Sequence, residues 1–319
     1  MSRPAYQDLP GIGQTARFDS LLTALALSSL VSTILLIMIG NLVRVTGNGL
    51  GCPDWPLCYG RAVPPLNIGA WVEFSHRLFG AIVGLQIAAL AALSWVAYRR
   101  DKWIFRPSIA AGVVLILQVS LGGIHVLNEL PRWTGLIHTG VALAIAGLLA
   151  IVVTVTQPSL RALTRRLYSA PGVTDLSAAA IAAALATYVL LLTGSLVTRT
   201  GSSLACPSFP LCGLESVSEQ LRPFVTVQLV HRIVAVTVAF FIGLILWRLT
   251  RQLPDDIVLR RLAISIAVLL LVQFGLGIVN VFLALPIWSR VLHLGVGASI
   301  WALMVILAVV LYRPRSTNS

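Results

Sequence analysis

The chain has 319 residues, of which 57% are hydrophobic and 11% are charged, and its mean hydropathy is +0.91. This composition excludes a soluble globular domain and predicts an integral membrane protein. The formal charge is +12. We expect anionic lipid headgroups and the placement of basic loops to account for this charge, and we expect no nucleic-acid partner.

Eight apolar runs are each long enough to cross a bilayer, because a helix of about 20 residues spans its hydrocarbon core. They cover residues 21–43, 72–98, 107–127, 133–156, 176–198, 224–247, 262–285 and 287–312. The first run is too long for a signal-peptide core, and no small-residue cleavage site follows it, which indicates a retained helix. The sequence therefore predicts an all-α membrane protein with eight transmembrane helices.

The basic residues predict the orientation of these helices, because Lys and Arg collect in cytoplasmic loops. Both termini and alternate loops contain 15 of the 23 basic residues, namely Arg3, Arg17, Arg99, Arg100, Lys102, Arg106, Arg161, Arg165, Arg166, Arg248, Arg251, Arg260, Arg261, Arg313 and Arg315. We therefore expect a multi-pass plasma-membrane protein with both termini in the cytoplasm.

All four cysteines fall in the loops predicted on the outer face: Cys52, Cys58, Cys206 and Cys212. An oxidising compartment favours disulfides over free thiols. The intervening PDWPL and PSFPL segments hold two prolines each, which restrict the backbone of a small ring. Two interpretations stay open, a structural staple and a redox-active dithiol, and the spacing is wider than in a reactive Cys-x-x-Cys pair.

The chain contains an internal repeat. LVRVTGNGLGCPDWPLC (42–58) matches LVTRTGSSLACPSFPLC (196–212) at an offset of 154, and QVSLGGIHV (118–126) matches QFGLGIVNV (273–281) at an offset of 155. Each repeat holds four crossings, an even number, so both keep the same orientation. This pattern predicts two tandem four-helix bundles related by a pseudo-two-fold axis along the membrane normal.

The repeat divides the chain into five segments. We expect a cytoplasmic N-terminal segment, a first four-helix unit, a cytoplasmic connector, a second four-helix unit and a cytoplasmic tail, at residues 1–20, 21–156, 157–175, 176–312 and 313–319.

Four of the five histidines follow the repeat. His76 and His138 are 62 residues apart, and so are His231 and His293. A tryptophan precedes three of them by five residues, at Trp71, Trp133 and Trp288. If these tryptophans lie in the interfacial belt, each histidine lies about 7 Å deeper, so that the imidazoles of a unit share one level.

An ionisable side chain within a membrane helix is a functional hypothesis in itself. Two imidazoles at one level on different helices can ligate a metal plane from both sides, which favours haem. Zinc requires three or four converging ligands, whereas copper stays open, and hydrogen bonding between helices is the plain structural alternative. The fifth histidine, His125, aligns with Asn280, and we interpret it as a helix-packing or haem-edge residue.

The two histidine sites differ in one neighbour. Glu73 precedes His76 by three residues and shares its helix face, whereas Gln228 precedes His231. A carboxylate beside a reactive cofactor can act as an acid or base or steer a substrate, and the alternative is a charge that favours the helix N-terminus. A single Glu-x-x-His motif does not suffice for a di-iron carboxylate bundle.

An arginine follows the first histidine of each unit, Arg77 in one and Arg232 in the other. Each is a candidate partner for a haem propionate, which pairs well with a guanidinium group. The alternative is that both side chains extend toward the interface.

The strings GNGLGCPDWPLC and EFSHR, together with the paired histidines and the duplication, resemble the haem A synthase family over about residues 20 to 312. The resemblance implies an oxidoreductase that converts haem O to haem A. It would oxidise the C8 methyl to a formyl group through a hydroxymethyl intermediate, for cytochrome oxidase biogenesis. It also implies a haem O synthase as the supplier of the substrate and an electron acceptor that the sequence does not identify.

The resemblance further implies a role for individual residues. His231 and His293 would hold haem b, His76 and His138 would line the substrate haem site, and Glu73 would take part in the oxidation. Cys52 and Cys58 match a pair expected as a disulfide, and Cys206 and Cys212 match a second pair that not every member carries. The rival interpretations are a dihaem b-type quinol oxidoreductase and a transporter built on parallel repeats.

Overall fold

The computed structural model describes residues 12–168, 174–206, 208, 212, 218–253 and 255–312. Within these ranges the chain forms nine α-helices, and eight of them are long and apolar enough to cross a membrane, as predicted. The helices are α1 (Ile12–Val45), α2 (Ile68–Ala97), α3 (Lys102–Leu127), α4 (Arg132–Thr156), α5 (Pro158–Tyr168), α6 (Thr174–Thr200), α7 (Arg222–Gln252), α8 (Ile257–Phe282) and α9 (Ile287–Leu311).

Most predicted runs end within a few residues of the observed helices, and the differences have local causes. Helix α1 begins at Ile12, well before the predicted start at residue 21. Helix α3 begins at Lys102 rather than at residue 107, because the Asp101 side chain accepts hydrogen bonds from the first free backbone N–H groups of the helix. Asp256 caps α8 in the same way in the second unit.

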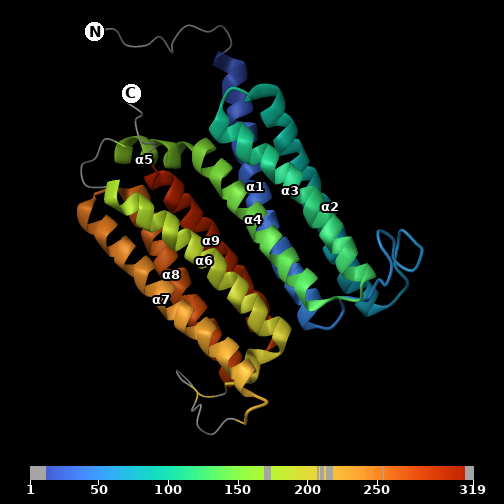
Figure 1. Cartoon of the computed structure of the whole chain (residues 1–319). Helices are drawn as coiled ribbons and strands as arrows, with labels where there is room; N and C mark the ends of the chain where they lie inside the picture. Colours follow the sequence, from blue (N-terminus) through green and yellow to red (C-terminus); the bar gives the residue numbers. More distant parts are fainter. Residues whose placement is uncertain are drawn as a thin grey trace, which may run out of the picture.

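The predicted connector contains a helix of its own. Helix α5 lies across one end of the molecule (Figure 1), with Leu163 and Leu167 buried against the bundle. Arg166 of α5 forms an ion pair of 3.1 Å with Asp256, which ties the connector to the start of α8. Helix α1 starts and helix α9 stops at this same end, which we call the connector end. The cysteine loops lie at the opposite end, the loop end.

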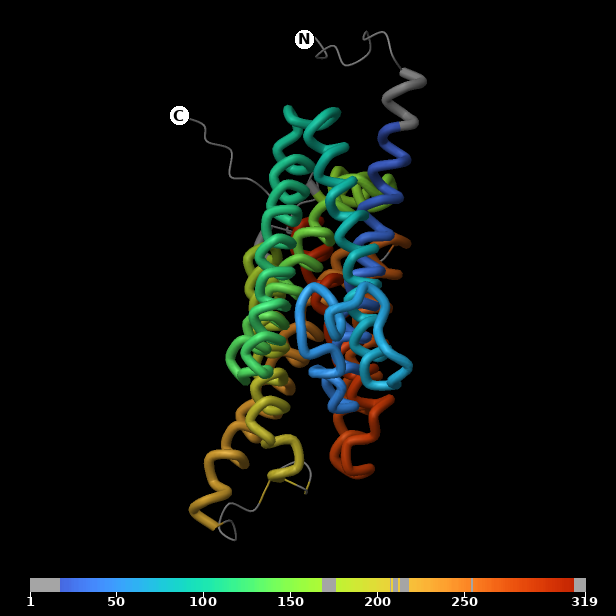
Figure 2. The backbone as a smooth tube through the Cα atoms, turned by 90° about the vertical axis from the view of Figure 1, so that its right-hand side faces the viewer, coloured from blue at the N-terminus to red at the C-terminus, as the bar shows by residue number. Residues whose placement is uncertain are grey.

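The transmembrane helices form two groups that stand side by side, α1–α4 and α6–α9 (Figures 1 and 2). In the first group each helix contacts its chain neighbours and α1 also contacts α4, and the same cycle of contacts joins α6 to α9 in the second. Between the groups, α1 contacts α9 and α4 contacts both α6 and α9. This reciprocal pattern is what the predicted pseudo-two-fold axis requires, and the axis itself stays a prediction.

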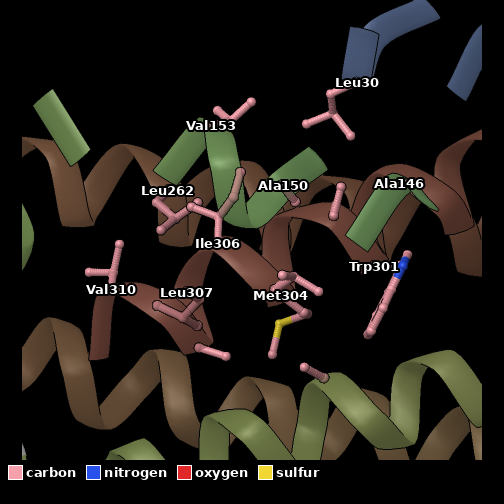
Figure 3. Packing of buried hydrophobic residues seen from close by; sticks show 14 of the residues in the cluster. Leu30, Ala146, Ala150, Val153, Leu262, Trp301, Met304, Ile306, Leu307 and Val310 are labelled. Carbon is pink, nitrogen blue, oxygen red and sulfur yellow. The ribbon is translucent and has the colours of Figure 1, made fainter. Parts of the chain in front are cut away.

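Helices α4 and α9 form the centre of the molecule, where their buried apolar side chains interlock (Figure 3). The Trp301 ring packs against Gly147, where a β-carbon would come within 2.9 Å of it, and its indole N–H donates a 2.8 Å hydrogen bond to the carbonyl of Leu143. Close approach at a small residue is how helices associate in lipid, since water does not drive them together there. This rigid centre fixes both units relative to each other.

The repeat extends to the backbone of the turns at the loop end. Leu130 between α3 and α4 and Leu285 between α8 and α9 both have positive φ, 62° and 63°. Their N–H groups donate to the carbonyls of His125 and Asn280, at 2.8 and 2.9 Å. Branched residues rarely adopt this conformation, so its occurrence at both equivalent turns indicates that the two units share one design in detail.

Candidate functional site

Two disulfide-closed rings lie at the loop end. Cys52 is bonded to Cys58 and Cys206 to Cys212, with Cα–Cα distances of 4.7 and 5.5 Å. Both predicted disulfides are therefore present. Residues 207, 209–211 and 213–217 of the second loop lie outside the described part of the chain.

Glu73 and Gln228 hold the two rings in the same way. The Oε2 atom of Glu73 accepts a 2.8 Å hydrogen bond from the backbone N–H of Cys52, and Oε1 of Gln228 accepts one of 2.8 Å from Cys206. Both side chains are almost fully buried. Capture of the first cysteine of the ring is thus common to both units, and the property that distinguishes Glu73 is its negative charge.

Arg77 ties the first ring to helix α2. Its guanidinium group forms an ion pair with Glu73 and donates to the carbonyl oxygens of Cys52, Asp54 and Leu57, at 2.7 to 2.8 Å. Such charge-assisted hydrogen bonds are about twice as strong as neutral ones. The sequence suggested either propionate pairing or extension toward the interface, and these contacts are a third use of the side chain.

Arg232 occupies the corresponding position in the second unit. It donates to the carbonyl oxygens of Cys206 and Ser208, at 2.7 Å each, and to the sulfur of Cys206 at 3.0 Å. The guanidinium groups of both predicted propionate partners therefore contact the rings. Their use as propionate ligands stays a prediction.

The first ring packs onto the loop end of its bundle. The exposed carboxylate of Asp54 accepts hydrogen bonds from the N–H groups of Gly60 and Tyr59, at 2.7 and 2.6 Å, and these bonds hold the pKa of Asp54 below its usual value. The Trp55 ring lies against Gly123 of α3, where a β-carbon would be 3.0 Å away. The Cys52–Cys58 ring thereby covers part of α3, the helix that also contains His125.

The structure brings the predicted histidines together in pairs. His76 of α2 lies within electrostatic range of His138 of α4, and His231 of α7 lies within range of His293 of α9. The Nδ1 atoms of His76, His138 and His293 are buried and have no hydrogen-bond partner in the described chain. Buried polar nitrogens nearly always have a partner, so these orphaned atoms indicate rings that are suited to an additional ligand.

A two-histidine donor set suits haem, whose iron takes one axial ligand on each face. Over the residues that the structure describes, no three His, Cys, Asp or Glu side chains converge as a zinc site requires. The residues present therefore fit a haem in each unit better than a tetrahedral metal ion.

Every one of these histidines packs against a glycine of a neighbouring helix. A β-carbon at the glycine would approach the nearest imidazole atom to between 2.9 and 3.5 Å, in the pairs Gly40–His76, Gly122–His138, Gly194–His231 and Gly277–His293. Glycine thus leaves room for the rings. These glycines were not predicted from the sequence, although Gly122 and Gly277 align within the repeated strings.

Side-chain partners of the histidines also follow the repeat, and these too were missed. Gln118 lies 3.0 Å from Nε2 of His138, and Gln273 lies 3.3 Å from Nε2 of His293. The two glutamines align at the offset of 155. The amide groups contact ring nitrogens that a metal would require, so ligand binding would have to displace them.

The units differ at the remaining histidines. Thr193 lies 2.9 Å from Nδ1 of His231, whereas the aligned residue beside His76 is Ile39, which has no hydrogen-bonding group. His125 contacts Thr134 at 2.6 Å and stacks on the ring of His138, with centroids 6.5 Å apart and planes inclined by 18°. The first site therefore gains an imidazole and a carboxylate, and the second gains a hydroxyl group.

These features define a class of protein: a multi-pass membrane protein built from two four-helix units, each with a pair of half-buried histidines and a disulfide-closed loop. Residues 23–71 and 66–305 match the family described as cytochrome oxidase assembly protein, and the chain belongs to this family.

Named relatives agree with this assignment. The chain is 31% identical over 289 residues to the heme A synthase of Symbiobacterium thermophilum, a match that covers 89% of this chain and 93% of the relative. It is 29% identical over 283 residues to that of Bacillus pumilus, with coverage of 85% and 89%. It is 30% identical over 226 residues to that of Bacillus cereus, with coverage of 67% and 68%. The resemblance stated from the sequence is confirmed.

Proposed function

We propose that this protein is a haem A synthase, an oxidoreductase that oxidises the C8 methyl group of haem O to a formyl group through a hydroxymethyl intermediate. The product serves cytochrome oxidase biogenesis. The observation that supports this most directly is the inequality of two otherwise repeated histidine sites. Only the first has a carboxylate, Glu73, above its histidine pair, as a division into a reacting site and an electron-carrying site requires.

In this proposal the first unit binds the substrate. His76 and His138 hold haem O between α2 and α4, and Gly40 and Gly122 leave space for their rings. The Cys52–Cys58 ring, held by Glu73 and Arg77, covers the loop end of the site. The Cys52–Cys58 ring would thereby limit the access of water to the bound haem. Glu73 is positioned to take up a proton when the methyl group is oxidised.

The second unit holds the resident cofactor. His231 and His293 would hold haem b, which would supply one-electron transfer away from the substrate site. With Nδ1 protonated, His231 would donate a hydrogen bond to the Thr193 hydroxyl group 2.9 Å away, which would fix the orientation of the ring and raise its basicity. An external electron acceptor then receives the electrons.

The proposed location is the plasma membrane, with both termini in the cytoplasm and the disulfide rings on the outer face. The support is the concentration of Arg and Lys at the connector end, which includes Arg161, Arg165 and Arg166 on α5. The substrate is a poorly soluble lipid-like haem, so we propose direct delivery by a haem O synthase in the same membrane.

The test is extraction and mass analysis of haems after co-expression with a haem O synthase. The expected result is haem A or its hydroxymethyl precursor in cells with the intact protein, and neither in cells with His138→Ala. If the intact protein yields only haem b and unchanged haem O, the oxidase proposal is wrong and a dihaem electron carrier replaces it.

A further inference from the structure

Three arginines from three helices gather where the two units meet, near the loop end. Arg44 ends α1, Arg199 ends α6, and Arg290 lies in the first turn of α9. Asn41 joins two of them, because its Oδ1 accepts from the Arg44 guanidinium at 2.8 and 3.1 Å while its Nδ2 donates to the carbonyl of Arg290 at 2.8 Å. Arg290 in turn donates to the carbonyl of Val45 at 3.3 Å. We call this group the interface arginines.

The interface arginines repel one another, and none of them forms an ion pair within the part of the chain that the structure describes. The charges of Arg44 and Arg290 interact unfavourably, and so do those of Arg199 and Arg44. The two ion pairs found in the described ranges involve other residues, Arg77 with Glu73 and Arg166 with Asp256. The Nε atom of Arg290 is buried without a hydrogen-bond partner in this part of the chain. Clustered, half-buried cations of this kind are costly unless an anion joins them.

The cluster does not follow the internal repeat. At the offset of 154, Arg44 aligns with Thr198 and Arg199 aligns with Val45, and at 155 Arg290 aligns with Gly135. None of the counterparts is basic. The arginines are therefore not part of the shared scaffold, and a packing role common to both units does not explain them.

Arg199 connects the cluster to the first histidine pair, although it belongs to the second unit. Its guanidinium group lies directly over Gly135 of α4, where any β-carbon would overlap with it, and it donates to Thr139 Oγ1 at 3.3 Å. Thr139 follows the predicted haem ligand His138 in the chain. The charge of Arg199 also acts on both His138 and His125. An anion bound by Arg199 would therefore lie beside the first site.

We propose that Arg44, Arg199 and Arg290 bind the propionate carboxylates of the porphyrin substrate in the first unit. This assignment rests on the proposed function. Guanidinium groups bind carboxylates through paired, charge-assisted hydrogen bonds, and two propionates bring negative charge to a site of three cations. Arg77 and Arg232, the partners expected from the sequence, donate to carbonyl oxygens of the disulfide rings. The substrate carboxylates would thus contact helices of both units and place the porphyrin at the interface between them.

The test compares haem O with its dimethyl ester, which keeps the ring and the iron but lacks both carboxylates. The full-length protein is purified with its haem b, and each haem is titrated by absorbance and tryptophan quenching. We expect the intact protein to bind haem O about tenfold or more tightly than the ester. Arg199→Gln and Arg290→Gln should weaken haem O binding to the level of the ester and leave ester binding unchanged.

Two further variants separate the possible causes. Arg132→Gln removes an exposed charge at the start of α4 and should keep the preference. Arg199→Lys keeps the charge, loses the fork geometry and should keep part of the preference. Retained haem b in the second unit verifies folding of each variant.

The proposal is wrong if Arg199→Gln prefers haem O over the dimethyl ester as strongly as the intact protein does. It is also wrong if the intact protein shows no preference for haem O over the ester. A phospholipid phosphate shares the anionic chemistry, so binding of phosphatidylglycerol is measured in parallel by native mass spectrometry. If the variants lose this lipid and keep the preference for haem O, the cluster is a lipid site and the proposal is wrong. Because the titration needs no turnover, its result does not depend on whether haem A formation is detected.

Discussion

The two four-helix units share a scaffold and differ in the groups that touch their histidines. Both have an aspartate cap on the third helix, a left-handed turn before the fourth, glycines that face the imidazole rings, and a disulfide ring held through its first cysteine. Around this common frame, the first unit has Glu73 and His125 where the second has Gln228 and Asn280. The comparison teaches that a duplicated membrane scaffold can keep its packing while a few side chains beside its histidines change.

The comparison also shows which property distinguishes Glu73 from Gln228. Gln228 makes the same hydrogen bond to a cysteine N–H, at the same distance of 2.8 Å. Anchoring the ring therefore requires an acceptor oxygen and no charge. An effect that is lost when the charge of Glu73 is removed, while its hydrogen bond is kept, must therefore arise from the first site alone.

The largest expected effect comes from removing one proposed haem-binding histidine in each unit. His293→Ala should lower the haem b content of the purified protein by about tenfold or more, since a ligand to the iron is lost. His138→Ala should retain haem b and lose product formation. Haem extraction with pyridine haemochrome spectra measures both. Equal loss of haem b in the two variants would contradict the division between the units.

A smaller effect is expected at the partner of His231. Thr193→Val removes the hydroxyl group 2.9 Å from Nδ1, and loss of such a partner lowers affinity for the metal group by about 10- to 100-fold. Thr198→Val is the matched control, because that hydroxyl group bonds only to Ser195 within its own helix. Competition of bound haem b with apomyoglobin gives the affinities. Identical haem loss from both variants would show that the Thr193 contact is immaterial.

The smallest expected effect concerns the pH dependence of the first ring. Hydrogen bonds from Gly60 and then Tyr59 lower the pKa of Asp54, so their contribution is present above the ordinary carboxyl pKa and is lost as the pH falls through the lowered value. Asp54→Asn should speed reduction of Cys52–Cys58 by a phosphine about threefold at pH 7, because contacts at the surface contribute little.

The difference between Asp54→Asn and the intact chain should shrink as the pH falls through the lowered pKa of Asp54 and vanish below it, where both lack the charge. Reduction of Cys206–Cys212, in the other unit, serves as the internal control and should not change. A rate ratio for the first ring that stays constant from pH 7 to a pH well below the ordinary carboxyl pKa, where Asp54 is protonated, would exclude the carboxylate as its stabilising group.

The sequence predicted the features that depend on the order of residues along the chain and not on contacts between helices. Apolar runs predicted all eight membrane helices, and the aligned strings predicted the duplicated histidines and both rings. The connector helix was not predicted, because its apolar residues are few and it is stabilised by burial of Leu163 and Leu167 against other helices.

Features that depend on tertiary contact were out of reach of the sequence. The glycine–histidine pairs join residues of different helices, and the hydrogen bonds of Arg77 depend on a loop that folds back over α2. The interface arginines come from α1, α6 and α9, and only the packing of the two units brings them together. Charge counting assigned basic residues to sides of the membrane and could not detect such a cluster.

The most direct test of the division between the units is Glu73→Gln, which turns the first site into a copy of the second at this position. The variant is co-expressed with a haem O synthase, and its haems are extracted and identified by mass. Because glutamine can still accept the Cys52 hydrogen bond, we expect an intact ring and normal haem b content. We expect haem A formation to fall by about 100-fold, the contribution typical of a positioned acid or base. Haem A at the level of the intact protein would instead show that Glu73 only anchors the ring, as Gln228 does, and would contradict the account.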